Sequence, residues 1–326
     1  MYKLNYLNYP QTSDVCVSKE LSIETLSTNE EFEKLSKSFT SKFNFSSLHS
    51  FSFSKEGFLG LMLELKVNIA VSLGESEAVV QAAKLYESLG FSVTYIDISK
   101  NAIINYKAIE SLKEEYLFLS PYIIDTFVKV DLKKVKESFK GTVIANISAN
   151  LDASNCDIIY FDAYKLSGYF THSVLLHNDI FQEQNLANVD TIGLKLISDA
   201  VSKEITAISC KNEFIKVLKE TIKDDLLFFV DADATLDNVL HFGLKDIKAR
   251  QVIRNLSLDN IFVTNGEGCS LGLSRPSRVI QAMGYTELQS RQFLSLSFNK
   301  DLNSDEILYL VSKIGKSYRQ IKALHA

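Results

Sequence analysis

Two short segments of the chain carry side chains that can perform covalent chemistry. In segment 161–169, Lys165 follows an apolar run and precedes a turn that contains glycine, which is where α/β sheets present reactive groups. A lysine in that position can form a Schiff base when burial lowers its pKa, and an ordinary exposed lysine is the alternative interpretation. Segment 265–277 is rich in glycine and holds Cys269, whose thiol either reaches a neighbouring pocket or is chemically inert. The sequence thus offers one amine and one thiol as candidate catalytic groups.

The elements that must position these groups follow a regular alternation of strand and helix. Apolar, β-branched runs occur at 67–72, 92–98, 117–119, 143–147, 157–161 and 173–176, and amphipathic helical patterns lie between them at 75–89, 107–115 and 131–139. Strands that are apolar throughout need cover on both faces, which predicts an α/β fold with a mostly parallel sheet.

Later segments mix helical and β patterns and predict a smaller α+β domain at the carboxyl end. Helices are expected at 191–209, 211–222, 245–256 and 304–324, and β runs at 226–230, 238–244, 261–264 and 293–298. The stretch 36–55 is rich in Ser, Lys and Phe, and we expect it to be a loop or a docking arm.

Composition excludes several classes of function. The chain has 326 residues, of which 46% are hydrophobic and 23% are charged, which suits a globular protein of one or two domains. The net charge is −5 and the lysines are scattered, so we expect no nucleic-acid partner. No apolar run is long enough to span a membrane and no signal-peptide layout is present, so we expect a cytoplasmic protein without a membrane partner. The four cysteines include no C-x-x-C pair, so we expect no metal site.

Five segments match, in the right order, the motifs of one known enzyme family. They are 44–49 (N-P-S-S-x-H), 162–168 (S-A-H-K-x-x-G), 263–270 (S-x-G-S-A-C), 275–284 (E-P-S-x-V-L-x-A-L-G) and 303–307 (T-x-E-E-I). In these segments the chain resembles the cysteine desulfurases of NifS/IscS type, which are class V aminotransferases among the fold-type I pyridoxal phosphate (PLP) enzymes. The resemblance implies a PLP-transferase-like fold with a large domain over 45–205. It also implies a small domain made of 1–44, including an N-terminal arm, and 206–326.

The resemblance assigns roles to particular residues. Lys165 would hold PLP covalently, and Cys269 would take the sulfur of bound L-cysteine as a persulfide and pass it to a sulfur-acceptor protein. The family also implies a homodimer, in which Thr191 would be lent to the cofactor site of the partner subunit.

The rest of the implied pocket departs from the family's pattern. Ser76 replaces a histidine that stacks on the cofactor ring, and Asn146 replaces the aspartate that pairs with the pyridine nitrogen. Ala149 replaces a glutamine that supports the ring oxygen, and segment 123–127 replaces N-N-E-T-G. Asp162 replaces a phosphate-binding serine and would repel the phosphate.

Two further departures concern length and substrate. The chain is shorter than the family's members, and we expect the missing material between His49 and Val67, where the family has its first large-domain helix and a phosphate-binding turn. Arg291 lies two positions before the family's substrate-binding arginine, and on a strand it would face the same side and could bind the substrate carboxylate.

Two functions therefore remain open at the level of sequence. One is a PLP-dependent cysteine desulfurase that uses Lys165 and Cys269. The other is a catalytically inactive, PLP-free homologue that acts as a scaffold, a regulator or a sulfur carrier.

Overall fold

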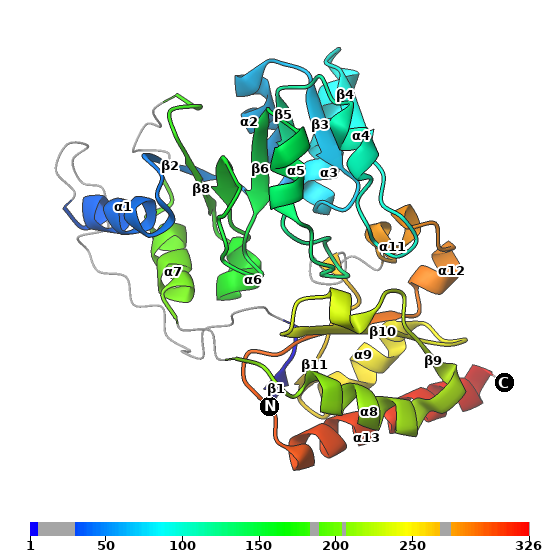
Figure 1. Cartoon of the computed structure of the whole chain (residues 1–326). Helices are drawn as coiled ribbons and strands as arrows, with labels where there is room; N and C mark the ends of the chain where they lie inside the picture. Colours follow the sequence, from blue (N-terminus) through cyan, green and yellow to red (C-terminus); the bar gives the residue numbers. More distant parts are fainter. Residues whose placement is uncertain (6–29, 183–188, 204–206, 268–274, 326) are drawn as a thin grey trace.

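The computed structural model of the chain describes residues 1–5, 30–182, 189–203, 207–267 and 275–325 (Figure 1). Within them the largest layer is a seven-stranded sheet with the order β2-β8-β7-β6-β5-β3-β4. Its strands are β2 (Ser47–Phe51), β3 (Ile69–Ser72), β4 (Val93–Ile96), β5 (Tyr116–Phe118), β6 (Thr142–Asn146), β7 (Ile158–Tyr160) and β8 (Ser173–His177). The neighbours from β4 to β7 pair in parallel, while β8 and β2 pair antiparallel at one edge. The predicted mostly parallel sheet is confirmed.

Helices cover both faces of this sheet. One core contains α2 (Lys55–Leu65) and α3 (Glu77–Ser88), and the other contains α1 (Glu30–Phe43), α4 (Tyr106–Glu110), α5 (Leu132–Ser138) and α7 (Thr191–Val201). In β6, Val143 and Ala145 belong to the second core and Ile144 to the first. Because side chains alternate between the faces of a strand, a strand covered on both faces must be apolar throughout, as the sequence pattern predicts.

Residues from 207 onward build a second, smaller layer, which Figure 1 shows below the large sheet. Its antiparallel sheet has the order β12-β10-β9, and β1 pairs in parallel with β11 beside it. The strands are β1 (Tyr2–Lys3), β9 (Leu226–Leu227), β10 (Val239–Leu244), β11 (Ile261–Phe262) and β12 (Phe293–Ser297). The helices of this layer are α8 (Lys211–Ile222), η3 (Lys223–Asp225), η4 (Ala232–Ala234), α9 (Ala249–Leu258) and α13 (Ser304–His325). Two short helices, α11 (Arg278–Ala282) and α12 (Glu287–Ser290), precede β12, and Val279 and Ile280 of α11 pack into a core of the large sheet. In the described ranges no helix is long and apolar enough to cross a membrane.

The prediction of a loop or docking arm over 36–55 is wrong. This stretch contains the end of α1, all of β2 and the start of α2. Phe39 and Phe43 of α1 pack on Phe161, with ring centroids 6.1 and 5.4 Å apart, so α1 lies against the large sheet. Apolar residues four positions apart form the buried stripe of α1, and the many serines and lysines around them concealed it in the sequence.

The expected loss of a helix between His49 and Val67 is also wrong. The helix α2 occupies 55–65, with Ser54 as its N-cap accepting a hydrogen bond from the Gly57 N–H at 3.2 Å. The segment that resembles N-P-S-S-x-H runs into the edge strand β2, which pairs with β8. The large sheet therefore has helical cover on this side.

Candidate functional site

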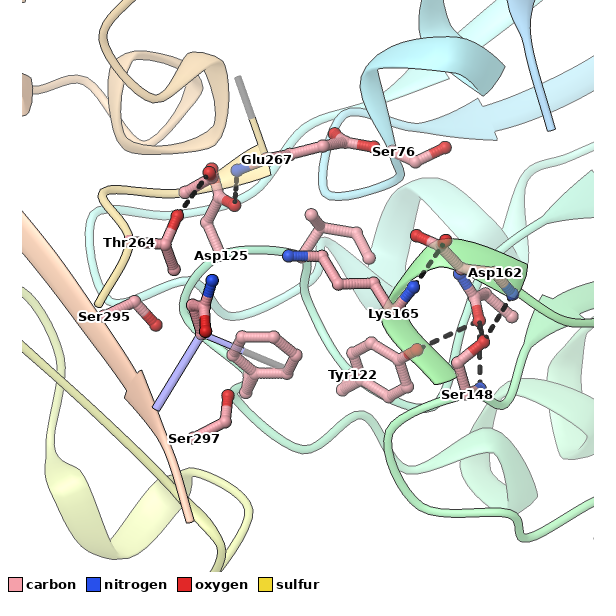
Figure 2. A pocket seen from close by; sticks show the side chains of 15 residues that line it. Ser76, Tyr122, Asp125, Ser148, Asp162, Lys165, Thr264, Glu267, Ser295 and Ser297 are labelled. Carbon is pink, nitrogen blue, oxygen red and sulfur yellow. Dashed lines mark hydrogen bonds between the residues drawn. The ribbon is translucent and has the colours of Figure 1, made fainter. Parts of the chain in front are cut away.

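The polar side chains of the site lie where the parallel strands end. The ends of the neighbouring strands β5, β6 and β7 are followed by Ser120 and Tyr122, by Asn146 and Ser148, and by Asp162 and Lys165, respectively. The carboxyl ends of parallel strands share one edge of the sheet, so these side chains meet although they are distant in sequence. Figure 2 shows Tyr122, Ser148, Asp162 and Lys165 around a cavity, with Ser295 and Ser297 of β12 on its other side. The site thus lies between the large sheet and the smaller layer.

Lys165 is held by a short helix, α6 (Ala163–Ser167), which follows β7. Asp162 is the N-cap, and its Oδ1 accepts a hydrogen bond from the backbone N–H of Lys165 at 3.1 Å. The Lys165 side chain leaves the helix and extends into the cavity (Figure 2). Burial raises the pKa of the Asp162 carboxyl, and the nearby charge of Lys165 opposes that rise. The predicted lysine is therefore presented at the carboxyl edge of the sheet.

The side chain of Tyr122 fills the space beside Asn146, and both residues are only 2% exposed. The Tyr122 hydroxyl donates a hydrogen bond to Asn146 Oδ1 at 3.1 Å and accepts one from the backbone N–H of Ala149 at 3.3 Å. Ser148 also donates to Asn146 Oδ1, from its backbone N–H at 2.9 Å and from its hydroxyl at 2.6 Å. Burial raises the pKa of Tyr122 well above its ordinary value, so the phenol stays neutral. The acceptor capacity of Asn146 Oδ1 is thus used within the protein.

A buried glutamate joins the ends of three strands. Glu75, in the connection from β3 to α3, accepts hydrogen bonds from the Ser120 N–H at 2.5 Å and from the Tyr160 hydroxyl at 3.0 Å. Burial raises the pKa of Glu75. These contacts fix the connection against β5 and β7, and so they position the start of α3.

The same connection is held by Arg278, the first residue of α11. Its guanidinium donates to the backbone carbonyl of Leu73 at 2.7 Å and to that of Glu75. Ser76 follows as the N-cap of α3, where its hydroxyl accepts a hydrogen bond from the Val79 N–H at 3.3 Å. Ser76 therefore caps a helix, and its short side chain provides no surface on which a ring could stack.

The carboxyl groups of Asp125 and Glu267 lie near each other in the site. Asp125 accepts hydrogen bonds from the Glu267 N–H at 2.8 Å and from the Ser277 hydroxyl at 2.6 Å. Glu267 Oε2 accepts from the backbone N–H of Glu77, at the start of α3, at 2.6 Å. Burial raises the pKa of both carboxyls, and the nearby Asp125 helps to bring that of Glu267 to about 8. At neutral pH the Glu267 carboxyl therefore retains its proton.

Two cavities meet at Lys165. The first, here called the Tyr122 cavity, has a volume of about 30 Å³, and its walls include Tyr122, Asp125, Phe127 and Asn146. The second, here called the Phe170 cavity, has a volume of about 340 Å³, and its walls include Phe53, Tyr164, Phe170 and His172. Asp162, Lys165 and Glu267 line both. Lys165 thus lines both a small space and a larger one.

Other residues predicted from the resemblance lie elsewhere. Arg291 follows α12 as its C-cap and forms an ion pair with Glu287 at 2.6 Å, so its expected position on a strand is wrong. Thr191 is the first residue of α7. Among the described residues that line the two cavities, neither Arg291 nor Thr191 occurs. Cys269 lies outside the described residues, two positions after Glu267.

Two other cysteines have environments that suppress their reactivity. Burial raises the pKa of Cys156 to about 12 and that of Cys210 to about 11. Because the thiolate is the reactive form of cysteine, neither thiol is an effective nucleophile near neutral pH.

Sequence reasoning missed Tyr122, Glu267 and Arg278 as determinants of the site. A tyrosine within an apolar run indicates core packing, so nothing in the sequence marks Tyr122 as the group that binds Asn146. Glu267 and Arg278 both fall within or beside the motifs of the carboxyl-terminal half. That position was the feature of the sequence that could have identified them as residues of the site. Their buried partners come from the other layer, which a local pattern does not reveal.

The residues present do not fit PLP in the position that the resemblance implies. The two groups expected to contact the ring are replaced by Asn146 and Ala149, and the Tyr122 hydroxyl bonds to both. The remaining volume of about 30 Å³ is room for a few water molecules and not for a pyridine ring. The carboxyl of Asp162 lies where the cofactor's phosphate is expected, and its charged form would repel that phosphate.

Comparisons with known proteins identify the fold. No protein-family model matches the chain. The cysteine desulfurase IscS of Clostridium botulinum (strain Kyoto / Type A2) is 21% identical over 287 residues, covering 77% of this chain and 72% of that protein. The putative cysteine desulfurase IscS 1 of Bacillus subtilis (strain 168) is 22% identical over 241 residues, covering 64% of each.

Solved structures agree with these sequence relatives. A NifS-like protein from Rickettsia africae matches with a TM-score of 0.67 and 12% identity, covering 92% of this chain and 91% of that chain. The apo structure of a cysteine desulfurase from Thermococcus onnurineus matches with a TM-score of 0.65 and 11% identity, covering 97% and 95%, respectively. The chain therefore has the NifS/IscS-like, fold-type I architecture of class V aminotransferases, and the resemblance and fold class predicted from the sequence are confirmed.

Proposed function

We propose that the protein is a cysteine desulfurase-like protein that works without PLP and acts by binding, as a scaffold, a regulator or a sulfur carrier. The observation that carries this proposal is the position of Tyr122. Its hydroxyl bonds to Asn146 and Ala149, the two positions that would contact the cofactor ring, and its side chain lines the cavity of about 30 Å³ that Lys165 also lines.

Making room for a cofactor ring would require Tyr122 to leave its site. Its ring is buried and packs on Phe127, with centroids 5.6 Å apart. Removing a large buried aromatic side chain from a core costs about 3–5 kcal/mol. A cofactor that entered the vacated space would still meet Asp162 with its phosphate and would find no stacking partner at Ser76.

A PLP-dependent cysteine desulfurase remains the second candidate, because Lys165 extends into a cavity at the carboxyl edge of the sheet. In that function Lys165 would hold the cofactor, L-cysteine would be the substrate and Cys269 would carry the sulfur. The homodimer, the sulfur-acceptor protein, the role of Thr191 and the cytoplasmic location remain predictions from the resemblance.

Absorbance spectroscopy distinguishes the two candidates. The purified protein is incubated with PLP, freed of excess cofactor and scanned, and sulfide release from L-cysteine is measured on the same sample. We expect no visible absorption band beyond that of a Lys165→Ala control, and no sulfide. A yellow band that borohydride bleaches and that the Lys165→Ala variant lacks would overturn the proposal, as would sulfide release that the same variant abolishes.

A further inference from the structure

The Phe170 cavity combines a ligand-sized volume with aromatic side chains. Its volume of about 340 Å³ lies within the range of small-molecule sites. Phe53 contributes one aromatic surface, and Tyr164 and Phe170 contribute another as a stacked pair with ring centroids 4.2 Å apart. Phe170 is 72% exposed, so this side of the cavity lies at the molecular surface. The face of an aromatic ring attracts a cation and also packs on an apolar body.

A carboxylate is fixed close to Phe170 in this cavity. Asp190 lines the cavity and is the N-cap of α7, where its Oδ1 accepts a hydrogen bond from the Gly193 N–H at 2.9 Å. Its Oδ2 accepts a second hydrogen bond from the backbone N–H of His172, also at 2.9 Å. A Cβ at position 193 would lie 2.6 Å from the His172 carbonyl oxygen and 2.9 Å from Asp190 Oδ2, so this close approach of α7 requires glycine. The Asp190 carboxylate is therefore held one hydrogen bond away from His172, which follows Phe170 by two positions.

The charged groups that line the cavity favour a cation over an anion. Asp162 adds a second carboxyl, and Lys165 brings a positive charge. The Lys165 side chain extends into the Tyr122 cavity toward Asp125 (Figure 2), and its charge opposes the rise in pKa that burial causes at both aspartates. A bound cation would favour the ionised form of Asp162 in the same way. Glu267, with a pKa of about 8, is uncharged at neutral pH. The carboxyls of Asp162 and Asp190 therefore make the cavity attract positive charge and repel negative charge.

We propose that the Phe170 cavity binds a small organic cation, whose charge pairs with Asp190 and whose apolar body packs on the stacked rings of Tyr164 and Phe170. Protonated amines and quaternary ammonium ions belong to this class of ligand. The resemblance places an anionic phosphate at the position of Asp162, so the charge selectivity proposed here is the reverse. This binding site goes beyond the proposed PLP-free function and does not depend on it, since neither a cofactor nor a covalent bond takes part.

Calorimetric titration of the full chain with three related probes tests the charge selectivity. Benzylamine, benzyl alcohol and benzoate share one aromatic ring and are positive, neutral and negative, respectively, at pH 7. We expect benzylamine to bind at least threefold more tightly than benzyl alcohol, and benzoate to bind most weakly. Equal affinities for benzylamine and benzyl alcohol would overturn the proposal, and so would tightest binding of benzoate or no binding of benzylamine at millimolar concentrations. Bound PLP is recognised by its own absorbance, so a failure of the proposed function is not confused with a failure here.

The variant Asp190→Asn tests the carboxylate, because it removes the charge and keeps a side chain that can cap α7. We expect it to weaken the binding of benzylamine at least threefold and to change that of benzyl alcohol by less than twofold. The matched control is Asp199→Asn, because Asp199 lies on the same helix in an exposed ion pair with Lys195 and should leave both affinities unchanged. If Asp190→Asn binds benzylamine as tightly as the natural chain does, the assigned role of Asp190 is wrong. The comparison of the three probes uses the natural chain, so a variant that fails to fold does not rescue the proposal.

The variant Phe170→Leu tests the aromatic surface, because it keeps an apolar side chain and removes the ring. We expect it to weaken the binding of benzylamine more than that of benzyl alcohol, since the attraction between a cation and the ring face is lost while apolar contact remains. Tyr309→Leu is the matched control, because Tyr309 is an aromatic residue of α13 that is 40% exposed and does not line the cavity among the described residues. Unchanged affinities of Phe170→Leu for both probes would overturn the placement of the cation beside Phe170.

Discussion

The Tyr122 cavity and the Phe170 cavity share three polar residues, yet one is nearly filled and the other is much larger. About 30 Å³ remains beside Tyr122, against about 340 Å³ beside Phe170. Tyr122 is 2% exposed and is hydrogen-bonded at its far end, whereas Phe170 is 72% exposed. The aromatic side chain of the smaller cavity is therefore a core residue, whereas that of the larger cavity lies at the surface.

Different interactions hold the Tyr122 and Phe170 side chains in place. Tyr122 is fixed by burial, by Phe127 and by the hydrogen bond to Asn146, which together contribute several kcal/mol. Phe170 is held mainly by its stacking on Tyr164, an interaction worth about 0.5–1.5 kcal/mol. The Tyr122 side chain is therefore part of the core, while the Phe170 side chain can adjust to a ligand.

The largest expected effect on stability comes from removing the buried side chain of Tyr122. Tyr122→Ala should lower the free energy of unfolding by about 3–5 kcal/mol, because it leaves a ring-sized space and removes the acceptor of the Ala149 backbone N–H. Phenol should bind in that space and raise the melting temperature of the variant, and PLP should still give no coloured complex. Urea unfolding and melting curves with and without phenol measure these effects.

Tyr122→Phe is the matched control, since it keeps the ring and removes the hydroxyl. We expect it to cost about 1–3 kcal/mol, from the lost hydrogen bonds alone, and to show no response to phenol. Equal losses in the two variants, or a phenol response in the natural chain, would contradict the picture of a filled cavity.

Most of the fold could be predicted from the sequence because its signal is local. The strands β3 to β8 are apolar runs that must be covered on both faces, and α3 and α13 have unbroken apolar stripes. The segment 36–55 could not be predicted in the same way. Its composition resembles that of a loop, and α1 becomes recognisable only when Phe39 and Phe43 are seen packed on Phe161.

The site was only partly predictable for a related reason. Lys165 could be identified, because a lysine between a strand and a glycine turn has a local signature. Asn146 could be identified as a substitution, because it stands where the resembled family has an aspartate. The role of Tyr122 could not, because it depends on a hydrogen bond across 24 positions of the chain. The position of Arg291 also depended on whether a short helix precedes β12, which the sequence does not show.

A smaller effect on stability concerns Asp162 and Glu267, whose side chains line both cavities. Burial raises the pKa of Glu267 from 4.5 to about 8 in the folded chain, so the folded state binds the proton more tightly than the unfolded state does. Stability from this group is therefore complete below about pH 4.5 and declines as the pH rises toward 8. The slope approaches about 1.4 kcal/mol per pH unit at most. The raised pKa values of Asp125 and Asp162 act in the same direction, while Arg278 and Lys165 oppose them.

Urea unfolding of the natural chain and of Glu267→Gln between pH 5 and pH 8 isolates this contribution. The glutamine variant cannot ionise at this position, so the difference in stability between it and the natural chain should shift in favour of the variant as the pH rises. A difference that stays constant over this range would mean that Glu267 is already ionised in the folded protein.

The smallest effect on stability is expected at Phe170. Phe170→Ala should change the free energy of unfolding by less than about 1 kcal/mol, because the side chain is mostly exposed. Leu288→Ala is the matched control, because Leu288 is 67% exposed on α12 and lines neither cavity among the described residues. Urea unfolding of both variants measures the two effects, and we expect them to be similarly small. A loss of several kcal/mol in Phe170→Ala alone would mean that its side chain is held by more than the stacking on Tyr164.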